Sequence, residues 1–170
     1  MVETPAAALL ADQLAADVDF FSIGSNDLVQ YVFAADREQP GLSSYLDHFH
    51  PAILRIIHLT VAGAARHGRP VSVCGGMASE RLAIPLLIGL GIAELSVSVP
   101  GIAEIKATIR RLNAGECRAV AEAALNARTG AEVRGIAAEC LNRAEPNRLS
   151  TNFVREIKQE KQLNKDEFVR

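Results

Sequence analysis

Short apolar segments alternate with helical patterns along the first two thirds of this chain, and this alternation limits the fold more than any other feature. Each segment is short enough for a buried strand and is followed by apolar residues at helical spacing, with glycine or proline at the borders. Strands joined by helical crossovers run parallel and are covered by helices, which predicts an α/β fold. The predicted strands are Met1–Glu3, Asp19–Ile23, Val71–Cys74 and Glu94–Val99, and helices are predicted over Ala6–Ala16, from Pro51 to Gly68, over Ala78–Leu90 and from Pro100 to Leu112.

Four strand–helix units amount to half of an eight-fold (β/α)8 TIM barrel, which typically needs about 250 residues. The chain opens on what resembles the end of a strand, so we expect it to be a piece of a longer protein rather than a complete open sheet. Two further helices are predicted at Glu116–Ala127 and Thr129–Ala144. We therefore divide the chain into a half-barrel domain over residues 1–144 and a polar tail over residues 145–170, to which no function is assigned.

Composition narrows the class of protein. The chain has 170 residues, of which 49% are hydrophobic, and a formal net charge of -2. This composition indicates a soluble globular domain, and the near-neutral charge argues against a surface for nucleic acid or anionic membranes. The start of the chain lacks the features of a signal peptide, and no apolar run is long enough to span a membrane. The three scattered cysteines predict reduced thiols in a cytoplasmic protein.

The stretch Asp19–Arg37 has the pattern of a functional site. An apolar strand breaks at Gly24 into Ser25, Asn26 and Asp27, and a short helical segment follows. Parallel α/β folds place ligands at the C-terminal ends of their strands. The alternative is an ordinary strand–helix turn in which the Asn-Asp pair only caps the next helix.

Other polar groups follow the ends of neighbouring predicted strands. Glu3 and Asp27 are two carboxylates that could share one Mg²⁺, a metal that usually takes one or two of them. Arg37 and the backbone amides near Gly24 suit a phosphate or carboxylate ligand. Cys74, before two glycines, could donate or accept a proton. The alternatives are a solvated strand end for Glu3 and a small buried hydrophobic residue for Cys74.

The remaining cysteines and the histidines suggest no chemistry. Cys117 and Cys140 lie on apolar helical faces and are interpreted as structural. The histidines show no spacing typical of a metal site, and we interpret them as surface or satisfied core residues. They are His48, His50, His58 and His67.

Asp19–Arg37 resembles, along its whole length, the second signature of the enzymes that use phosphoenolpyruvate (PEP), in which an apolar strand leads into Gly-[Ser/Thr]-Asn-Asp-Leu-x-Gln and ends on Arg. The neighbouring segments resemble the C-terminal half of enzyme I of the bacterial sugar phosphotransferase system over about residues 1–144. The segments that carry this resemblance are VETPAAALLADQLA, HPAILRII, VSVCGGMAS and AIPLLIGLGIAELSVS. With Gly76 where enzyme I usually has Glu, the chain is more similar to the enzyme I module of multiphosphoryl transfer proteins.

The resemblance implies a role for each matching residue. Glu3 and Asp27 would ligate the Mg²⁺ that bridges PEP, and Asn26 and Asp27 would contact its phosphate. Arg37 would neutralise phosphate charge as the P–O bond breaks. Cys74 would protonate the methylene carbon of enolpyruvate to give pyruvate. The C-terminal half of a TIM barrel, a cytoplasmic location and dimerisation through the PEP-binding domain are also implied.

The resemblance further implies partners that this chain does not contain. The phosphoryl acceptor of the family is a histidine on a separate swivelling domain, and an HPr-type phosphocarrier follows it. We therefore expect the chain to be an incomplete catalytic fragment of a phosphotransferase. Two alternatives stay open: an enzyme of the PEP synthase or pyruvate phosphate dikinase type, and a non-catalytic fragment that retains a dimerising surface.

Overall fold

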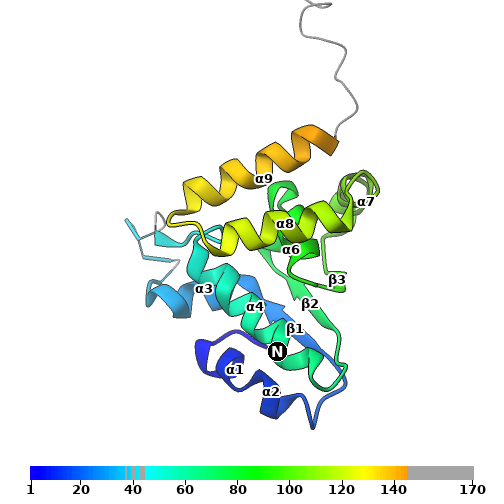
Figure 1. Cartoon of the computed structure of the whole chain (residues 1–170). Helices are drawn as coiled ribbons and strands as arrows, with labels where there is room; N and C mark the ends of the chain where they lie inside the picture. The colour runs from blue at the N-terminus through cyan, green and yellow to red at the C-terminus, as the bar shows by residue number, and fades with distance from the viewer. Residues whose placement is uncertain (37, 40, 43–44, 145–170) are drawn as a thin grey trace, which may run out of the picture.

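A computed structural model describes residues 1–36, 38–39, 41–42 and 45–144. This part of the chain is mostly helical and contains a parallel sheet with the strand order β1–β2–β3 (Figure 1). The first half comprises α1 (Pro5–Leu9), α2 (Ala11–Leu14), β1 (Phe21–Gly24), α3 (Ser25–Phe33), α4 (Pro51–Ala65), β2 (Val71–Cys74) and α5 (Gly76–Ser79). The second half comprises the 3-10 helix η2 (Arg81–Ala83), α6 (Ile84–Gly89), β3 (Glu94–Leu95), the 3-10 helix η3 (Val99–Gly101), α7 (Ile102–Ile109), α8 (Ala114–Leu125) and α9 (Gly130–Ala144).

The parallel register agrees with the predicted α/β fold. β1 and β2 pair from Phe21 with Val71 to Gly24 with Cys74. Val2 adds an isolated parallel bridge to Ile23, and its amide donates a hydrogen bond of 2.7 Å to the Ser22 carbonyl. The first residues therefore lie beside β1, as the strand pattern before Thr4 predicts.

The predicted strand Glu94–Val99 is wrong in length, since only Glu94 and Leu95 pair with β2. One more backbone hydrogen bond, from the Ser96 amide to the Val73 carbonyl, continues the contact at 2.8 Å. Val99, Pro100 and Gly101 then form η3, because proline fits the first turn of a helix and cannot donate a hydrogen bond to a sheet.

The two faces of the sheet differ in polarity. Phe21 and Ile23 of β1 belong to the hydrophobic core, together with Val71 and Val73 of β2. The alternate residues Ser22, Ser72 and Cys74 are half-buried. Because neighbouring side chains on a strand point to opposite faces, one face of the sheet packs on the core and the other carries small polar side chains.

Two predicted helices are each interrupted. The predicted helix Ala6–Ala16 breaks at Leu10, between α1 and α2. The predicted helix Ala78–Leu90 is divided by Glu80, whose backbone is extended, and by η2. Pro85 lies in the first turn of α6, where its missing amide hydrogen costs no helical hydrogen bond.

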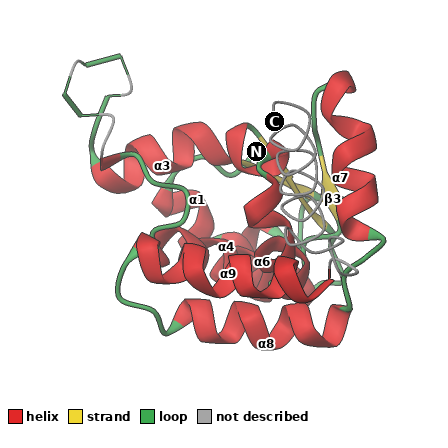
Figure 2. Cartoon of the chain, turned by 90° about the horizontal axis from the view of Figure 1, so that it is seen from above, coloured by secondary structure: helices red, strands yellow, loops and turns green. Residues whose placement is uncertain are grey.

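The last two helices, α8 and α9, lie side by side at one side of the described fold, as both views show (Figures 1 and 2). Asn113 begins α8 by accepting hydrogen bonds from the amides of Gly115 and Glu116, at 2.8 and 3.2 Å. Cys117 and Cys140 are fully buried, which agrees with their interpretation as structural residues. None of the helices described is both long and apolar enough to cross a bilayer.

Candidate functional site

The C-terminal ends of β1 and β2 meet at one edge of the sheet, because Gly24 and Cys74 are register partners. The sequence predicts a short polar break after Gly24, but α3 begins directly at Ser25. Ser25, Asn26 and Asp27 therefore form the first turn of a helix, and their backbone positions are fixed at the edge of the sheet.

Hydrogen bonds join the first turn of α3 to the turn after β2. The Ser25 hydroxyl donates to the Cys74 carbonyl at 2.7 Å and accepts from the Met77 amide at 3.4 Å. Asn26 Oδ1 accepts from the Gly76 amide at 2.9 Å. No side-chain hydrogen bond caps α3, so Asn26 bonds the neighbouring turn instead of its own helix.

Two glycines permit close approaches at this edge. A Cβ atom at Gly24 would lie 2.5 Å from Glu3 Oε1, so the Glu3 carboxylate lies directly over the Gly24 backbone. Gly75 has a φ of +89°, and a Cβ atom there would lie 2.6 Å from the Ser25 hydroxyl oxygen. Any larger residue would displace Glu3 in the first case and Ser25 in the second.

Cys74 differs from the other two thiols. Its Sγ donates to the Ile23 carbonyl at 3.5 Å and accepts from the Ser22 hydroxyl at 3.9 Å, on the polar face of the sheet. It is half-buried, whereas Cys117 and Cys140 are fully buried. Burial raises the pKa of Cys117 to about 11 and also raises the pKa of Cys140. Cys74 is thus the cysteine that can reach a ligand.

Four of the five predicted site residues lie together at one edge of the sheet, and the fifth, Arg37, is not among the described residues. Glu3, Asn26, Asp27 and Cys74 all follow strand ends at the same edge of the sheet, and Glu3 and Asp27 are both half-buried. Within the described part of the chain there is no group of three or more His, Cys, Asp or Glu side chains arranged around a common metal position.

Three of the four histidines agree with their interpretation, and His48 does not. His58 and His67 are exposed, and His50 Nδ1 accepts from the Ala52 amide at the start of α4, at 3.2 Å. His48 is half-buried, and its Nε2 atom is buried without a hydrogen-bond partner in the described part of the chain. Burial lowers the pKa of His48, which favours the neutral imidazole.

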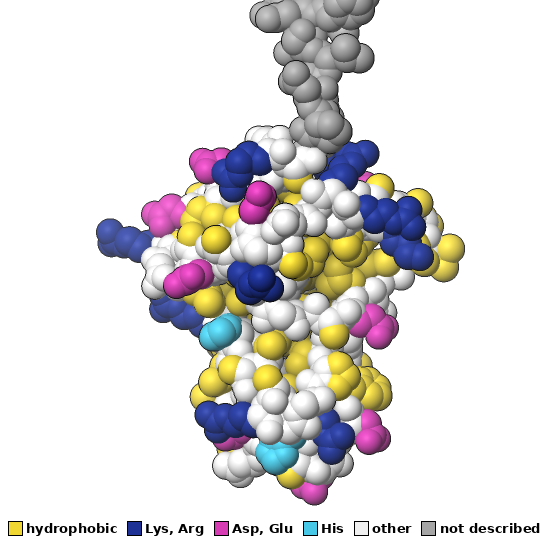
Figure 3. Space-filling model, turned by 45° about the vertical axis from the view of Figure 1, so that its right-hand side comes forward, with side chains coloured by type: hydrophobic (Ala, Val, Ile, Leu, Met, Phe, Trp, Pro, Cys, Tyr) yellow, Lys and Arg dark blue, Asp and Glu magenta, His cyan; other side chains and the backbone are white. Residues whose placement is uncertain are grey.

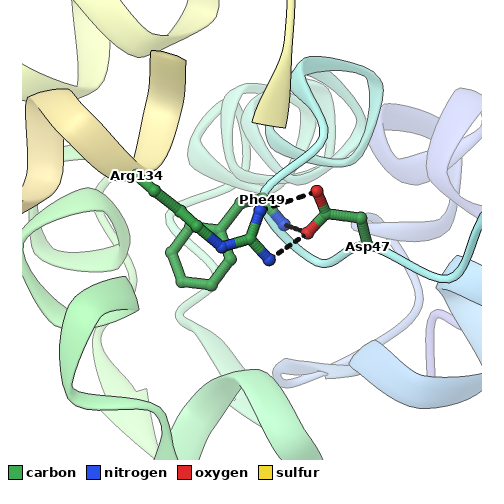
Figure 4. Close-up of polar contacts among 3 residues, drawn as sticks. All are labelled: Asp47, Phe49 and Arg134. Carbon is green, nitrogen blue, oxygen red and sulfur yellow. Dashed lines mark hydrogen bonds and ion pairs between the residues drawn. The ribbon is translucent and has the colours of Figure 1, made fainter. Parts of the chain in front are cut away.

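His48 lies beside the site, in a segment that the sequence predicts as a polar loop over Glu38–His50 but does not link to the site. A Cβ atom at Gly76 would lie 3.4 Å from His48 Cε1. The neighbouring residue Asp47 forms an ion pair with Arg134 of α9, and the Arg134 guanidinium lies over the ring of Phe49 (Figure 4). Asp47 and Arg134 are 87 positions apart, and no local pattern links them.

Comparison with known proteins gives the same family as the sequence motifs. Residues 1–114 match the model of the PEP-utilising enzyme, PEP-binding domain. A multiphosphoryl transfer protein of Xanthomonas campestris pv. campestris is 47% identical over 139 residues, which are 82% of this chain and 17% of that protein. A phosphoenolpyruvate-protein phosphotransferase of Listeria monocytogenes is 45% identical over 133 residues, 78% of this chain and 23% of that protein.

A phosphoenolpyruvate-protein phosphotransferase of Bacillus subtilis is 44% identical over 133 residues, again 78% of this chain and 23% of that protein. The chain thus spans less than a quarter of the length of these relatives. The resemblance inferred from the motifs is confirmed. Because the family model matches more than half of it, this chain belongs to the PEP-utilising enzymes, in the part that forms their PEP-binding domain.

Proposed function

We propose that this chain is the PEP-binding part of a phosphotransferase that transfers the phosphoryl group of PEP to a protein histidine and releases pyruvate. The observation that carries the proposal is the shared edge of β1 and β2, where Asn26 Oδ1 accepts from the Gly76 amide at 2.9 Å and the Glu3 carboxylate lies over Gly24. The names of the relatives, phosphoenolpyruvate-protein phosphotransferase and multiphosphoryl transfer protein, support the reaction class.

The proposed domain is the C-terminal half of a TIM barrel over residues 1–144. The polar face of the sheet supports this, since Ser22, Ser72 and Cys74 would face the interior of a closed barrel.

The edge of the sheet at β3 also supports a half barrel. An apolar pocket of about 310 Å³ lies there between β3, α6 and α7, and Figure 3 shows apolar side chains gathered on that side of the molecule. Its lining includes Ile88, Ile92, Leu95, Ile109 and Leu112.

The donor set at the strand ends fits a hard divalent cation. Glu3 and Asp27 present two half-buried carboxylates from neighbouring segments at one edge. Mg²⁺ usually takes one or two protein carboxylates and completes its coordination with water and phosphate oxygens, so a larger cluster is not required. When bound, Mg²⁺ would neutralise negative charge on the phosphate of PEP.

The residues of the chain would hold PEP and handle one proton. Asn26 and the backbone amides of the first turn of α3 would orient the phosphate, and Arg37 would balance its charge. After the phosphoryl group leaves, the Cys74 thiol gives its proton to the methylene carbon of enolpyruvate. The S–H bond breaks, a C–H bond forms, and the enolate becomes the ketone of pyruvate. The Ser22 hydroxyl donates toward Sγ and would stabilise the thiolate that remains.

The parent protein would supply the parts that lie outside this chain. We propose that a swivelling domain carries the acceptor histidine, that an HPr-type phosphocarrier or a fused equivalent accepts the phosphoryl group from it, and that the whole protein is a cytoplasmic homodimer. The large share of each relative that this chain does not cover is consistent with such additional domains.

Calorimetric titration of this chain with PEP, with and without Mg²⁺, tests the proposal. We expect binding that requires Mg²⁺ in the wild type and in Asp19→Ala, which removes an exposed carboxylate at the opposite end of β1. Asp27→Ala should abolish it. Absence of binding by the wild type would overturn the proposal that this chain holds PEP, and equal binding by Asp27→Ala would overturn the role of Asp27.

A further inference from the structure

Helix α9 is held to the loop before α4 by a bidentate ion pair. Arg134 Nη1 donates to Asp47 Oδ2 at 2.8 Å, and Nη2 donates to Asp47 Oδ1 at 2.6 Å. Two parallel charge-assisted hydrogen bonds fix orientation as well as distance. Figure 4 shows the guanidinium of Arg134 facing the carboxylate of Asp47, joined to it by these hydrogen bonds.

The same guanidinium also packs on the loop. Its central carbon lies 4.4 Å from the centroid of the Phe49 ring, which is fully buried. Asp47 Oδ1 in turn accepts a hydrogen bond of 2.9 Å from the Phe49 amide. The Asp47 carboxylate also lies directly against Gly130, the first residue of α9, so that a Cβ atom at position 130 would clash with it. The loop is thus fixed against α9 on both sides of His48.

His48 connects this loop to the candidate site. The side chains of Asn26 and His48 both approach the side of Gly76 where a Cβ atom would lie, at 3.2 Å from Asn26 Oδ1 and 3.4 Å from His48 Cε1. The ion pair of Arg134 and Asp47, the peptide link from Asp47 to His48, the closeness of His48 to the Gly76 turn and the hydrogen bond from the Gly76 amide to Asn26 connect these elements. They join α9 to the first turn of α3 and to the turn after β2.

The position of His48 is unfavourable for its imidazole, so other contacts of the loop must hold His48 there. Its Nε2 atom is buried without a hydrogen-bond partner among the described residues, and a buried unpaired nitrogen opposes folding. Released from the loop, the imidazole would regain hydrogen bonds to water. The ion pair of Asp47 and Arg134, with side chains 23% and 43% exposed, supplies the restraint.

We propose that Arg134 is a positioning residue of the PEP site: it holds the Asp47–Phe49 loop so that the His48 imidazole stays packed beside the Gly76 turn, next to Asn26. This proposal rests on the proposed function. Arg134 lies beyond residues 1–114, which the family model matches, so the site depends on a helix outside the matched part.

The test uses the whole chain and compares Arg134→Leu and Arg134→Lys with Arg66→Leu. Arg66 forms a single ion-pair contact of 2.9 Å with Asp12, is 70% exposed and serves as the matched control. Two quantities are measured for each: PEP affinity with Mg²⁺ present, and the NMR resonances of the His48 imidazole, assigned with His48→Gln. The resonances report the position of His48 whether or not PEP binds.

We expect Arg134→Leu to weaken PEP binding by about tenfold or more and to shift the His48 resonances, as loss of an outer supporting residue typically does. Arg134→Lys keeps the charge but not the two parallel hydrogen bonds, so it should give a smaller shift in both quantities, and it remains informative if Arg134→Leu fails to fold. Arg66→Leu should change neither.

Wild-type PEP affinity in both Arg134 variants would overturn the proposal. If the wild-type chain binds no PEP, the proposed function fails for this chain, and the NMR measurement then decides the positioning role separately. Unchanged His48 resonances in Arg134→Leu and Arg134→Lys would overturn that role, and shifted resonances would support it.

Discussion

The Gly76 amide donates a hydrogen bond of 2.9 Å to Asn26 Oδ1, although the two residues are 50 positions apart in the chain. The bond joins the turns that follow β1 and β2 at the edge of the sheet where the candidate site lies. Because the donor is a backbone group and the acceptor is a side chain, the bond can be removed at Asn26 without altering the Gly76 turn itself.

We expect Asn26→Ala to lower the free energy of unfolding by about 1 kcal/mol, the usual net contribution of one hydrogen bond, and to weaken PEP binding. Asn126→Ala is the matched control, since Asn126 donates a hydrogen bond of 2.9 Å to the Glu122 carbonyl on the exposed side of α8. Urea unfolding and PEP titration check both variants. Equal loss of PEP affinity in the two variants would contradict a role for Asn26 at the site.

Gly75 should tolerate alanine much less well than Gly68. Both glycines have positive φ, +89° at Gly75 and +65° at Gly68. A Cβ atom at Gly75 would lie 2.6 Å from the Ser25 hydroxyl oxygen, whereas a Cβ atom at Gly68 would have no neighbouring atom within 4 Å. We expect Gly68→Ala to cost about 1 kcal/mol through backbone strain alone. Gly75→Ala should cost roughly 1–3 kcal/mol more because of the clash. Similar urea midpoints for the two variants would show that the Gly75 turn can relax.

Iodoacetamide should modify Cys74 well before the other two cysteines in the folded protein. The thiolate is the reactive form, and the raised pKa of Cys117, about 11, leaves little thiolate at pH 8. Cys117 and Cys140 are also fully buried. Mass spectrometry of the labelled peptides measures the order, and all three should react in urea. Labelling of Cys117 or Cys140 at the rate of Cys74 without urea would contradict the packing of α8 on α9.

The chain should lose stability as the pH falls below about 6.5, and His48 should contribute to this loss. Burial lowers the pKa of His48 in the folded state from its usual value of 6.5. The unfolded chain therefore binds the proton first, and the stability present above pH 6.5 is lost as the pH falls through the folded-state pKa. Urea unfolding between pH 7.5 and 5 should show a shallower decline for His48→Gln. An equally shallow decline for His58→Gln, at an exposed position of α4, would argue against burial as the cause.

Local patterns predicted the elements whose boundaries are set by local chemistry. β2 matches its predicted range Val71–Cys74, because proline precedes this apolar segment and two glycines follow it. α4 begins at Pro51 as predicted. The predicted helix Ala78–Leu90 was wrong as one element, since the extended Glu80 backbone and the 3-10 helix η2 divide it. Pro85 lies in the first turn of α6, one of the two positions that the sequence allowed for it. β3 is shorter than predicted because a strand ends where its pairing with the neighbouring strand ends. β3 pairs with β2 only at Glu94 and Leu95, although its β-propensity extends further.

Contacts between distant residues were beyond sequence reasoning. The strand-end pattern identified Glu3, Asn26, Asp27 and Cys74, since parallel strands bring such positions to one edge. It did not identify His48, which was interpreted as a surface or satisfied core residue. The position of His48 depends on the ion pair between Asp47 and Arg134, and charged residues so far apart in sequence have many possible partners.

The bridge between Val2 and Ile23 has a practical consequence for protein engineering. The Gly24 amide donates to the Val2 carbonyl at 3.0 Å, and Glu3 follows at once with its carboxylate over Gly24. Because the bridge is parallel, the chain before Val2 runs back along β1 toward Ser22, away from the edge where Glu3 lies. An affinity tag or fusion partner joined to Met1 would therefore leave the molecule away from the candidate site. The whole chain with a tag at Met1 is thus a suitable form of the protein for the titrations above.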